Sequence, residues 1–135
     1  MARVPRTPQL SLDLDGRPGT VRTARREVEH FLDRCADRTQ LRPQTRLDVG
    51  LVVAELLANA CVHAPGPCRL VVRLSGARVD IAVRDTSPLL PVAADRPGSP
   101  GPGGYGLLVV TRLCTDVRAV RVRGGKVVRA TVVQR

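Results

Sequence analysis

The stretch that decides the fold is LVVAELLANACVHA, residues 51–64. Within it Glu55, Asn59 and His63 recur at every fourth position, so in an α-helix their side chains form one stripe. The other sides of this helix are almost entirely apolar, which is typical of a helix in a hydrophobic core. Desolvating a carboxylate and an amide there costs free energy unless they have a partner. We therefore expect the stripe to be a binding site, and a metal-nucleotide is a ligand that would account for it.

Hydrophobic periodicity predicts the elements around this helix. Alternation over residues 9–15 favours a strand, and apolar residues at three- and four-residue steps favour a helix over residues 20–38. Pro43 suits the first turn of the central helix, which should run to His63. After the break at residues 64–67, the pattern predicts a hairpin (68–74 and 78–84), a helix (104–114) and a second hairpin (116–123 and 126–133).

Residues 86–102 hold five prolines and predict a long loop. Loops of this length in a compact domain are more often lids or binding loops than simple connections. We expect a flexible N-terminus over residues 1–8 and a single domain over residues 9–135.

Composition predicts a soluble cytoplasmic protein. The longest clearly apolar run, residues 49–54, is far too short to cross a membrane, and no signal peptide is evident. The four cysteines include no Cys-x-x-Cys pair, which favours reduced thiols. A zinc site at Cys61, His63 and Cys68 is the alternative, although a fourth ligand is not evident.

The chain is strongly basic, with 22 Lys and Arg against 12 Asp and Glu and a formal net charge of +10. Such a balance favours acidic partners, but it also fits a compositional preference of the source for arginine. Lys126 is the one lysine among these basic residues.

Three motifs together resemble the Bergerat (GHKL) ATP-binding fold of gyrase-type ATPases, heat-shock chaperones and histidine kinases. ELLANACVHA is similar to the N-box of this superfamily, VDIAVRDTSPLLP to its first glycine box and GGYGLLVVTRL to its second. The greatest likeness is to small anti-sigma factor serine/threonine kinases of the actinomycete type. This resemblance implies an α+β fold: a two-layer sandwich in which a mixed, mainly antiparallel sheet carries helices on one face.

The resemblance also implies roles for individual residues. Asn59 would coordinate Mg²⁺ on ATP, which suits an amide oxygen because magnesium prefers hard oxygen ligands. Glu55 would be the general base, and Asp85 would accept a hydrogen bond from the exocyclic amine of adenine. The remaining residues implied at the nucleotide pocket are His63, Pro88, Gly103, Gly104, Tyr105, Gly106 and Leu107.

The sequence departs from the family pattern at three places. Thr86, Ser87 and Pro88 stand where the wider superfamily usually has a glycine. Tyr105 stands where relatives often have arginine, and Val127 where they commonly have a threonine that bonds near the adenine. These departures imply weak nucleotide binding.

The resemblance implies a kinase that phosphorylates a STAS-type anti-sigma factor antagonist, binds a sigma factor and forms a homodimer. A second hypothesis is a catalytically weak, ATP-dependent binding module. The third is a basic nucleic-acid-binding domain, which we rank last because one Phe, one Tyr and no Trp leave little for base stacking.

Overall fold

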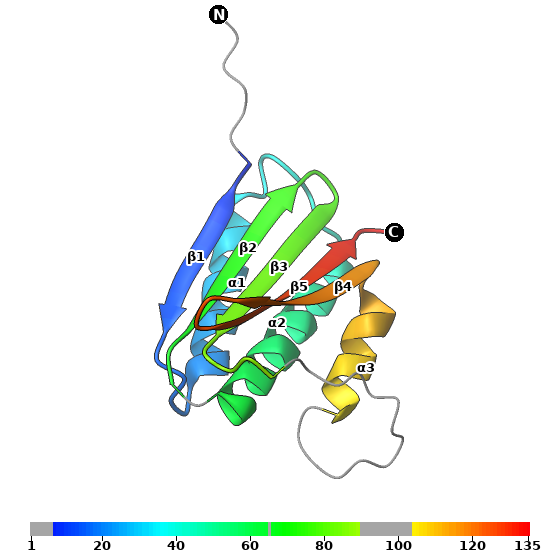
Figure 1. The fold of residues 1–135 in the computed structure, drawn as a ribbon. Coiled ribbons are helices and arrows are strands. Elements are labelled where there is room, and N and C mark those ends of the chain that lie inside the picture. Colours follow the sequence, from blue (N-terminus) through cyan, green and yellow to red (C-terminus); the bar gives the residue numbers. More distant parts are fainter. Residues whose placement is uncertain (1–6, 65, 90–103) are drawn as a thin grey trace, which may run out of the picture.

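The computed structural model describes residues 7–64, 66–89 and 104–135, and for His63 and residues 104–107 it describes the backbone alone. Five strands form one sheet in the order β1-β2-β3-β5-β4, and the helices lie on one face of it (Figure 1). No helix within the described ranges is long and apolar enough to cross a membrane. The elements are β1 (Gln9–Leu14), α1 (Thr20–Arg34), α2 (Pro43–His63), β2 (Cys68–Ser75), β3 (Arg78–Asp85), α3 (Gly104–Leu113), β4 (Asp116–Val122) and β5 (Gly125–Val133).

The core lies between the sheet and helices α1 and α2. On β3 the alternate residues Val79, Ile81 and Val83 are buried, and β2 shows the same two-residue period. Because successive side chains of a strand point to opposite faces, one face of these strands meets the helices. Helix α2 contributes the buried residues Val49, Val52, Val53, Leu56, Leu57 and Ala60 to this core.

The start of α1 is set by a short turn after β1. The carboxylate of Asp15 accepts hydrogen bonds from the backbone N–H of Arg17 (2.9 Å) and the hydroxyl of Thr20 (3.3 Å). The bond from Arg17 is the main reason why the pKa of Asp15 lies below its usual value. Gly16 has φ +74°, and a Cβ built there would lie 2.1 Å from the carbonyl oxygen of Gly66. A glycine is therefore required where this turn meets the turn after α2.

The two-layer α+β fold predicted from the sequence is confirmed. The predicted sheet was mixed, but every strand pair among the described residues is antiparallel. The strand between β3 and β4 is β5, so β3 and β4, which have the same direction, are not neighbours.

Helix α2 has the predicted bounds, whereas α1 ends at Arg34 and not near Arg38. Residues 35–38 form tight turns, in which the N–H of Arg38 donates to the carbonyl of Cys35 at 2.9 Å. The flexible N-terminus predicted over residues 1–8 lies largely outside the described residues, as does most of the predicted lid. The single-domain assignment stays a prediction.

Candidate nucleotide site

The predicted site residues lie toward one edge of the molecule. The C-terminal end of α2, the end of β3 and the first residues of α3 all lie at the lower edge in Figure 1. Helix α2 packs against both β3 and α3, which holds these three motifs in one region. The topology thus brings together segments that are up to about fifty residues apart in sequence, although the site roles of their residues stay predictions.

Helix α2 has a flank that faces α1. Arg46 forms ion pairs with Glu29 (2.8 Å) and Asp33 (2.7 Å) of α1. A Cβ built on Gly50 would lie 3.7 Å from the guanidinium of Arg25, which is also on α1. Arg46 and Gly50 therefore define the α1 side of this helix.

Glu55 and Asn59 lie on the opposite flank of α2. Successive residues of an α-helix are turned by about 100°, which places Glu55, Asn59 and Asp48 roughly half a turn from Arg46 and Gly50. The charge of Asp48 contributes to the raised pKa of Cys114, directly after α3, so this flank faces α3. Glu55 and Asn59 thus point toward the side of α2 on which α3 begins.

Both side chains are half-buried, and neither makes a side-chain hydrogen bond or ion pair with another described residue. No buried side-chain N or O atom among the described residues lacks a hydrogen-bond partner, so the polar atoms of Glu55 and Asn59 reach solvent and are available to a ligand. The amide oxygen of Asn59 is a hard oxygen donor of the kind that Mg²⁺ prefers. This end of the site therefore fits a magnesium-bound triphosphate.

The second glycine box can be placed only in part. Gly104, Tyr105, Gly106 and Leu107 form the first residues of α3, but their side chains are outside the described part. Gly103 lies outside the described residues altogether, and His63 is the last residue of α2, again with its side chain outside the description.

Asp85 ends β3 with its side chain on the helix-facing side of the sheet and only 4% of its surface exposed. Both oxygens of its carboxylate have partners within the protein. Lys126 of β5, which is 4% exposed, donates from Nζ to Oδ1 of Asp85 at 2.9 Å and forms an ion pair with Oδ2 at 2.8 Å. The backbone N–H of Ser87 also donates to Oδ1, at 2.9 Å. The residue predicted to read adenine thus already has a cationic partner within the protein.

The strand register explains this pair. Asp85 and Lys126 are direct partners across β3 and β5, whereas Val127 is opposite Arg84 and faces the other side of the sheet. The interpretation that Val127 occupies the place next to the adenine carboxylate is therefore wrong, because a shift of one residue along a strand reverses the face. Gly125 begins β5 where a Cβ would lie 1.9 Å from the carbonyl oxygen of Asp85, so the close approach of these strands requires glycine.

Pro88 follows this pair in an exposed segment. Its carbonyl oxygen accepts a hydrogen bond from Nε of Arg121 on β4 at 3.2 Å. This bond ties the beginning of the predicted lid to the edge of the sheet.

The thiols of Cys61 on α2 and Cys68 on β2 are hydrogen-bonded to each other. Burial raises the pKa of both thiols, that of Cys68 to about 11. All four cysteines are free, and no cluster of three or more His, Cys, Asp or Glu that could hold a metal occurs among the residues whose placement is described.

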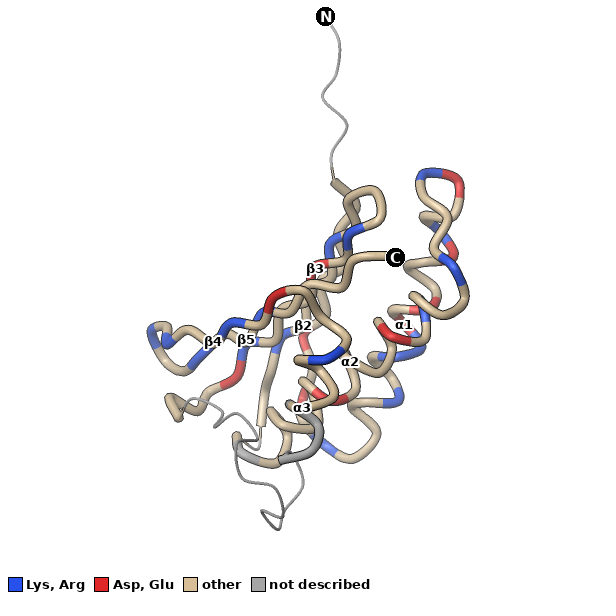
Figure 2. Tube along the Cα trace, turned by 90° about the vertical axis from the view of Figure 1, so that its right-hand side faces the viewer, with Lys and Arg blue, Asp and Glu red and all other residues tan. Residues whose placement is uncertain are grey.

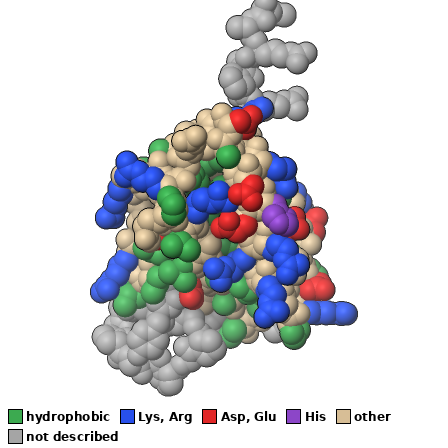
Figure 3. Space-filling model, turned by 180° about the vertical axis from the view of Figure 1, so that it is seen from behind, with side chains coloured by type: hydrophobic (Ala, Val, Ile, Leu, Met, Phe, Trp, Pro, Cys, Tyr) green, Lys and Arg blue, Asp and Glu red, His purple; other side chains and the backbone are tan. Residues whose placement is uncertain are grey.

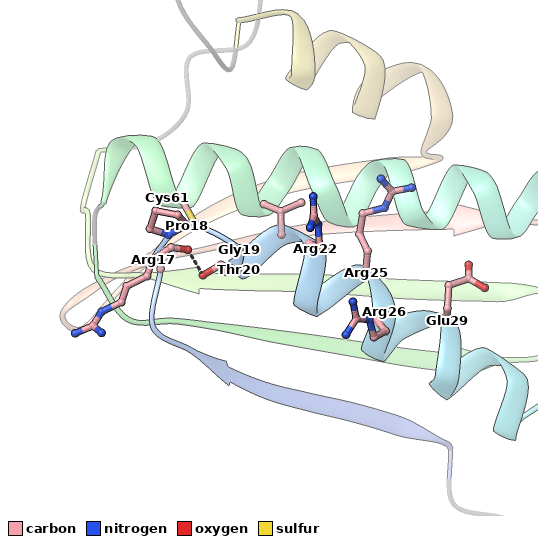
Figure 4. Close-up of a pocket in the computed structure, with 11 residues that line it drawn as sticks. Arg17, Pro18, Gly19, Thr20, Arg22, Arg25, Arg26, Glu29 and Cys61 are labelled. Carbon is pink, nitrogen blue, oxygen red and sulfur yellow. Dashed lines mark hydrogen bonds between the residues drawn. The ribbon is translucent and has the colours of Figure 1, made fainter.

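A basic groove that sequence reasoning missed runs along α1. It has a volume of about 1020 Å³ and is lined by Arg17, Arg22, Arg25 and Arg26, with Cys61 at its inner side (Figure 4). The arginines come from α1 and the turn before it, on the far side of α2 from Glu55 and Asn59. The groove is therefore separate from the candidate nucleotide site.

Comparison with known proteins defines the family. The model of the histidine kinase-like ATPase domain matches residues 15–132. The chain therefore belongs to the histidine kinase-like ATPase domain family, as its three motifs predict. None of the curated proteins matches the chain.

Two solved structures show how the fold compares. The crystal structure of the RsbU and RsbW domains of Rv1364c from Mycobacterium tuberculosis is similar with a TM-score of 0.71 and 19% sequence identity, over 95% of this chain. This chain spans 33% of that one. The histidine kinase domain of the blue-light activated kinase EL346 from Erythrobacter litoralis has a TM-score of 0.48 and 21% identity, over 78% of this chain and 60% of that chain. At such identities the first likeness supports the fold alone.

Proposed function

We propose that this protein binds Mg²⁺-ATP and is a serine/threonine kinase of the anti-sigma type. The observation that carries the proposal is the pair Glu55 and Asn59, half-buried on one flank of α2 and without side-chain partners among the described residues. Membership of the histidine kinase-like ATPase family and the likeness to a structure that includes an RsbW domain support it.

In this proposal Asn59 holds Mg²⁺ through its amide oxygen, together with water. Bound ATP would supply the phosphoryl group, and Mg²⁺ would neutralise part of its charge. Glu55, one turn earlier on the same flank, accepts the proton of a serine or threonine hydroxyl on the partner. The beginning of α3 supplies backbone N–H groups that favour phosphate oxygens.

The proposed protein substrate is a STAS-type anti-sigma factor antagonist, and phosphorylation of this antagonist would release the kinase to bind its sigma factor. We further propose a cytoplasmic location, and homodimerisation stays a prediction. The basic groove along α1 offers a surface for an acidic partner at a distance from the nucleotide site.

The alternative is a nucleotide-dependent binding module without useful turnover. In that case ATP would shape a partner surface without phosphoryl transfer. The two functions differ in whether Glu55 is needed.

Phosphoryl transfer from γ-labelled ATP to a panel of purified STAS-type antagonists from the source organism tests the proposal. We expect wild-type protein to label one of them on serine or threonine, and Glu55→Gln to reduce labelling by about 100-fold or more because the general base is lost. Mg²⁺-ATP affinity should stay within about threefold, since the carboxylate acts in the transition state.

Asp48→Asn is the matched control, because Asp48 lies on the same flank of α2 and, among the described residues, its side chain bonds Gln44 alone, at 2.9 Å. It should transfer phosphate like the wild type. Nucleotide binding without labelling of any antagonist would contradict the kinase and leave the binding module as the function.

A further inference from the structure

The Asp85–Lys126 pair departs from what a carboxylate reserved for adenine requires. Such a carboxylate needs a free oxygen facing the base, whereas both oxygens of Asp85 lie within 2.9 Å of Lys126 Nζ. Both residues are 4% exposed, so little water competes for this contact. An ion pair removed from water is screened weakly and is retained unless a better partner replaces it.

Lys126 differs from the other described basic residues of this chain in its type and in its buried position. It is the one lysine among 22 basic residues, and it occupies a helix-facing position of β5, the strand face to which Val128, Ala130 and Val132 contribute buried apolar side chains. An ammonium is a compact point charge with three donors.

The contacts of the Lys126 ammonium differ in length. Two contacts to Asp85 are short, but the contact to the carbonyl oxygen of Ser87 is 3.4 Å long. This weak contact can be exchanged for a stronger acceptor without breaking the ion pair. A purine with an oxygen at position 6 offers such an acceptor, and the lysine also neutralises the carboxylate that would otherwise repel this oxygen.

We propose that Lys126 determines which purine base is preferred next to Asp85, the residue that would contact adenine. By occupying Asp85 it removes the advantage of the 6-amino group of adenine, so that purine triphosphates with a 6-oxo group bind about as well as ATP. This inference rests on the proposed nucleotide site and concerns the base, whereas Glu55 and Asn59 concern the phosphates and the metal.

Titration calorimetry with three Mg²⁺-triphosphates tests the proposal. ATP carries an amino group at position 6, inosine triphosphate carries an oxygen there, and purine riboside triphosphate carries hydrogen. For the wild type we expect dissociation constants within about threefold of one another, because the charge of Lys126 already neutralises the carboxylate that would accept a hydrogen bond from the amino group. Lys126→Thr should restore a preference for ATP over inosine triphosphate of about tenfold or more, because an unpaired buried carboxylate favours a donor.

Arg129→Thr is the control, because it removes one positive charge from the same strand at an exposed position on the opposite face. It should leave the three affinities in their wild-type ratio. Circular dichroism and thermal unfolding establish that each variant is folded. If Lys126→Thr does not fold, the three wild-type affinities still decide the question.

A wild-type preference for ATP over both analogues of more than about tenfold would overturn the role of Lys126, while leaving the nucleotide site itself established. If no triphosphate binds to the wild type or to Lys126→Thr, the proposed ATP-binding function fails and this inference fails with it.

Discussion

At the scale of single residues, the ion pair of Asp85 with Lys126 is the feature that most separates this chain from the pattern its motifs imply. The two residues are 41 positions apart and meet only because β5 pairs with β3 in one particular register. Removing one partner alone leaves a buried charge, which is costly. For this reason the test of Lys126→Thr compares its affinities for the three triphosphates and does not rely on its stability.

The buried thiols give a pH dependence at the same scale. Burial raises the pKa of Cys68 and of Cys114 to about 11 from an ordinary value of 9.0. Because the unfolded chain ionises first, the stability that these neutral thiols contribute is present below pH 9 and is lost as pH rises toward about 11. We expect the urea midpoint to fall across this window.

The double variant Cys68→Ala/Cys114→Ala is the control for this prediction. It should be less stable than the wild type at neutral pH because two core side chains are shortened, but its urea midpoint should fall less steeply above pH 9. Equal slopes for the two proteins would show that other groups cause the alkaline loss.

At the scale of elements, Arg46 of α2 forms ion pairs with two carboxylates of α1, in addition to the apolar contacts of the two helices. Arg46 contacts Glu29 at 2.8 Å and Asp33 at 2.7 Å, and its side chain is 25% exposed. We expect Arg46→Ala to lower the free energy of unfolding by roughly 1 kcal/mol at low salt and by less at high salt, since both partners are open to solvent.

Arg69 provides the comparison, because its contact with Asp13 is 3.8 Å long and both side chains are largely exposed. Arg69→Ala should change the free energy of unfolding by less than about 0.5 kcal/mol in urea titrations. The same loss for both variants, unaffected by salt, would contradict a role for the charges of Arg46.

The elements themselves were largely predictable. Proline and glycine mark most of their ends, as at Pro43, the first residue of α2, and at Gly124 in the last hairpin. Hydrophobic periodicity then predicts whether each interval is a helix or a strand. The end of α1 was missed because residues 35–38 continue in tight turns that a helical pattern does not distinguish.

The candidate site was predictable to a smaller extent. Glu55 and Asn59 could be found because one helix turn relates them, which is a local pattern. The partner of Asp85 could not, because a one-residue change of register exchanges Lys126 for Val127, and no local signal distinguishes the two. The basic groove was missed because the local spacing of Arg17, Arg22, Arg25 and Arg26 does not show that the folded chain leaves a hollow beside α1.

At the scale of the whole molecule, the residues that give the net charge of +10 are not concentrated on one surface. Basic positions occur on the helices and on β4 and β5 (Figure 2), and on the helix-bearing face acidic side chains lie among the basic ones (Figure 3). A nucleic-acid-binding surface usually presents its basic residues in one stripe or patch. This distribution does not favour the nucleic-acid-binding hypothesis.

Titration calorimetry of the wild type and Asn59→Ala with Mg²⁺-ATP decides whether the stripe on α2 binds a metal-nucleotide. We predict micromolar binding by the wild type and a loss of about tenfold or more in Asn59→Ala, because the amide oxygen of Asn59 is the proposed ligand of the metal. Thermal unfolding of the ligand-free variant should match the wild type, since Asn59 makes no side-chain hydrogen bond to a described residue. Absence of binding by the wild type, or equal affinity in the variant, would contradict the account.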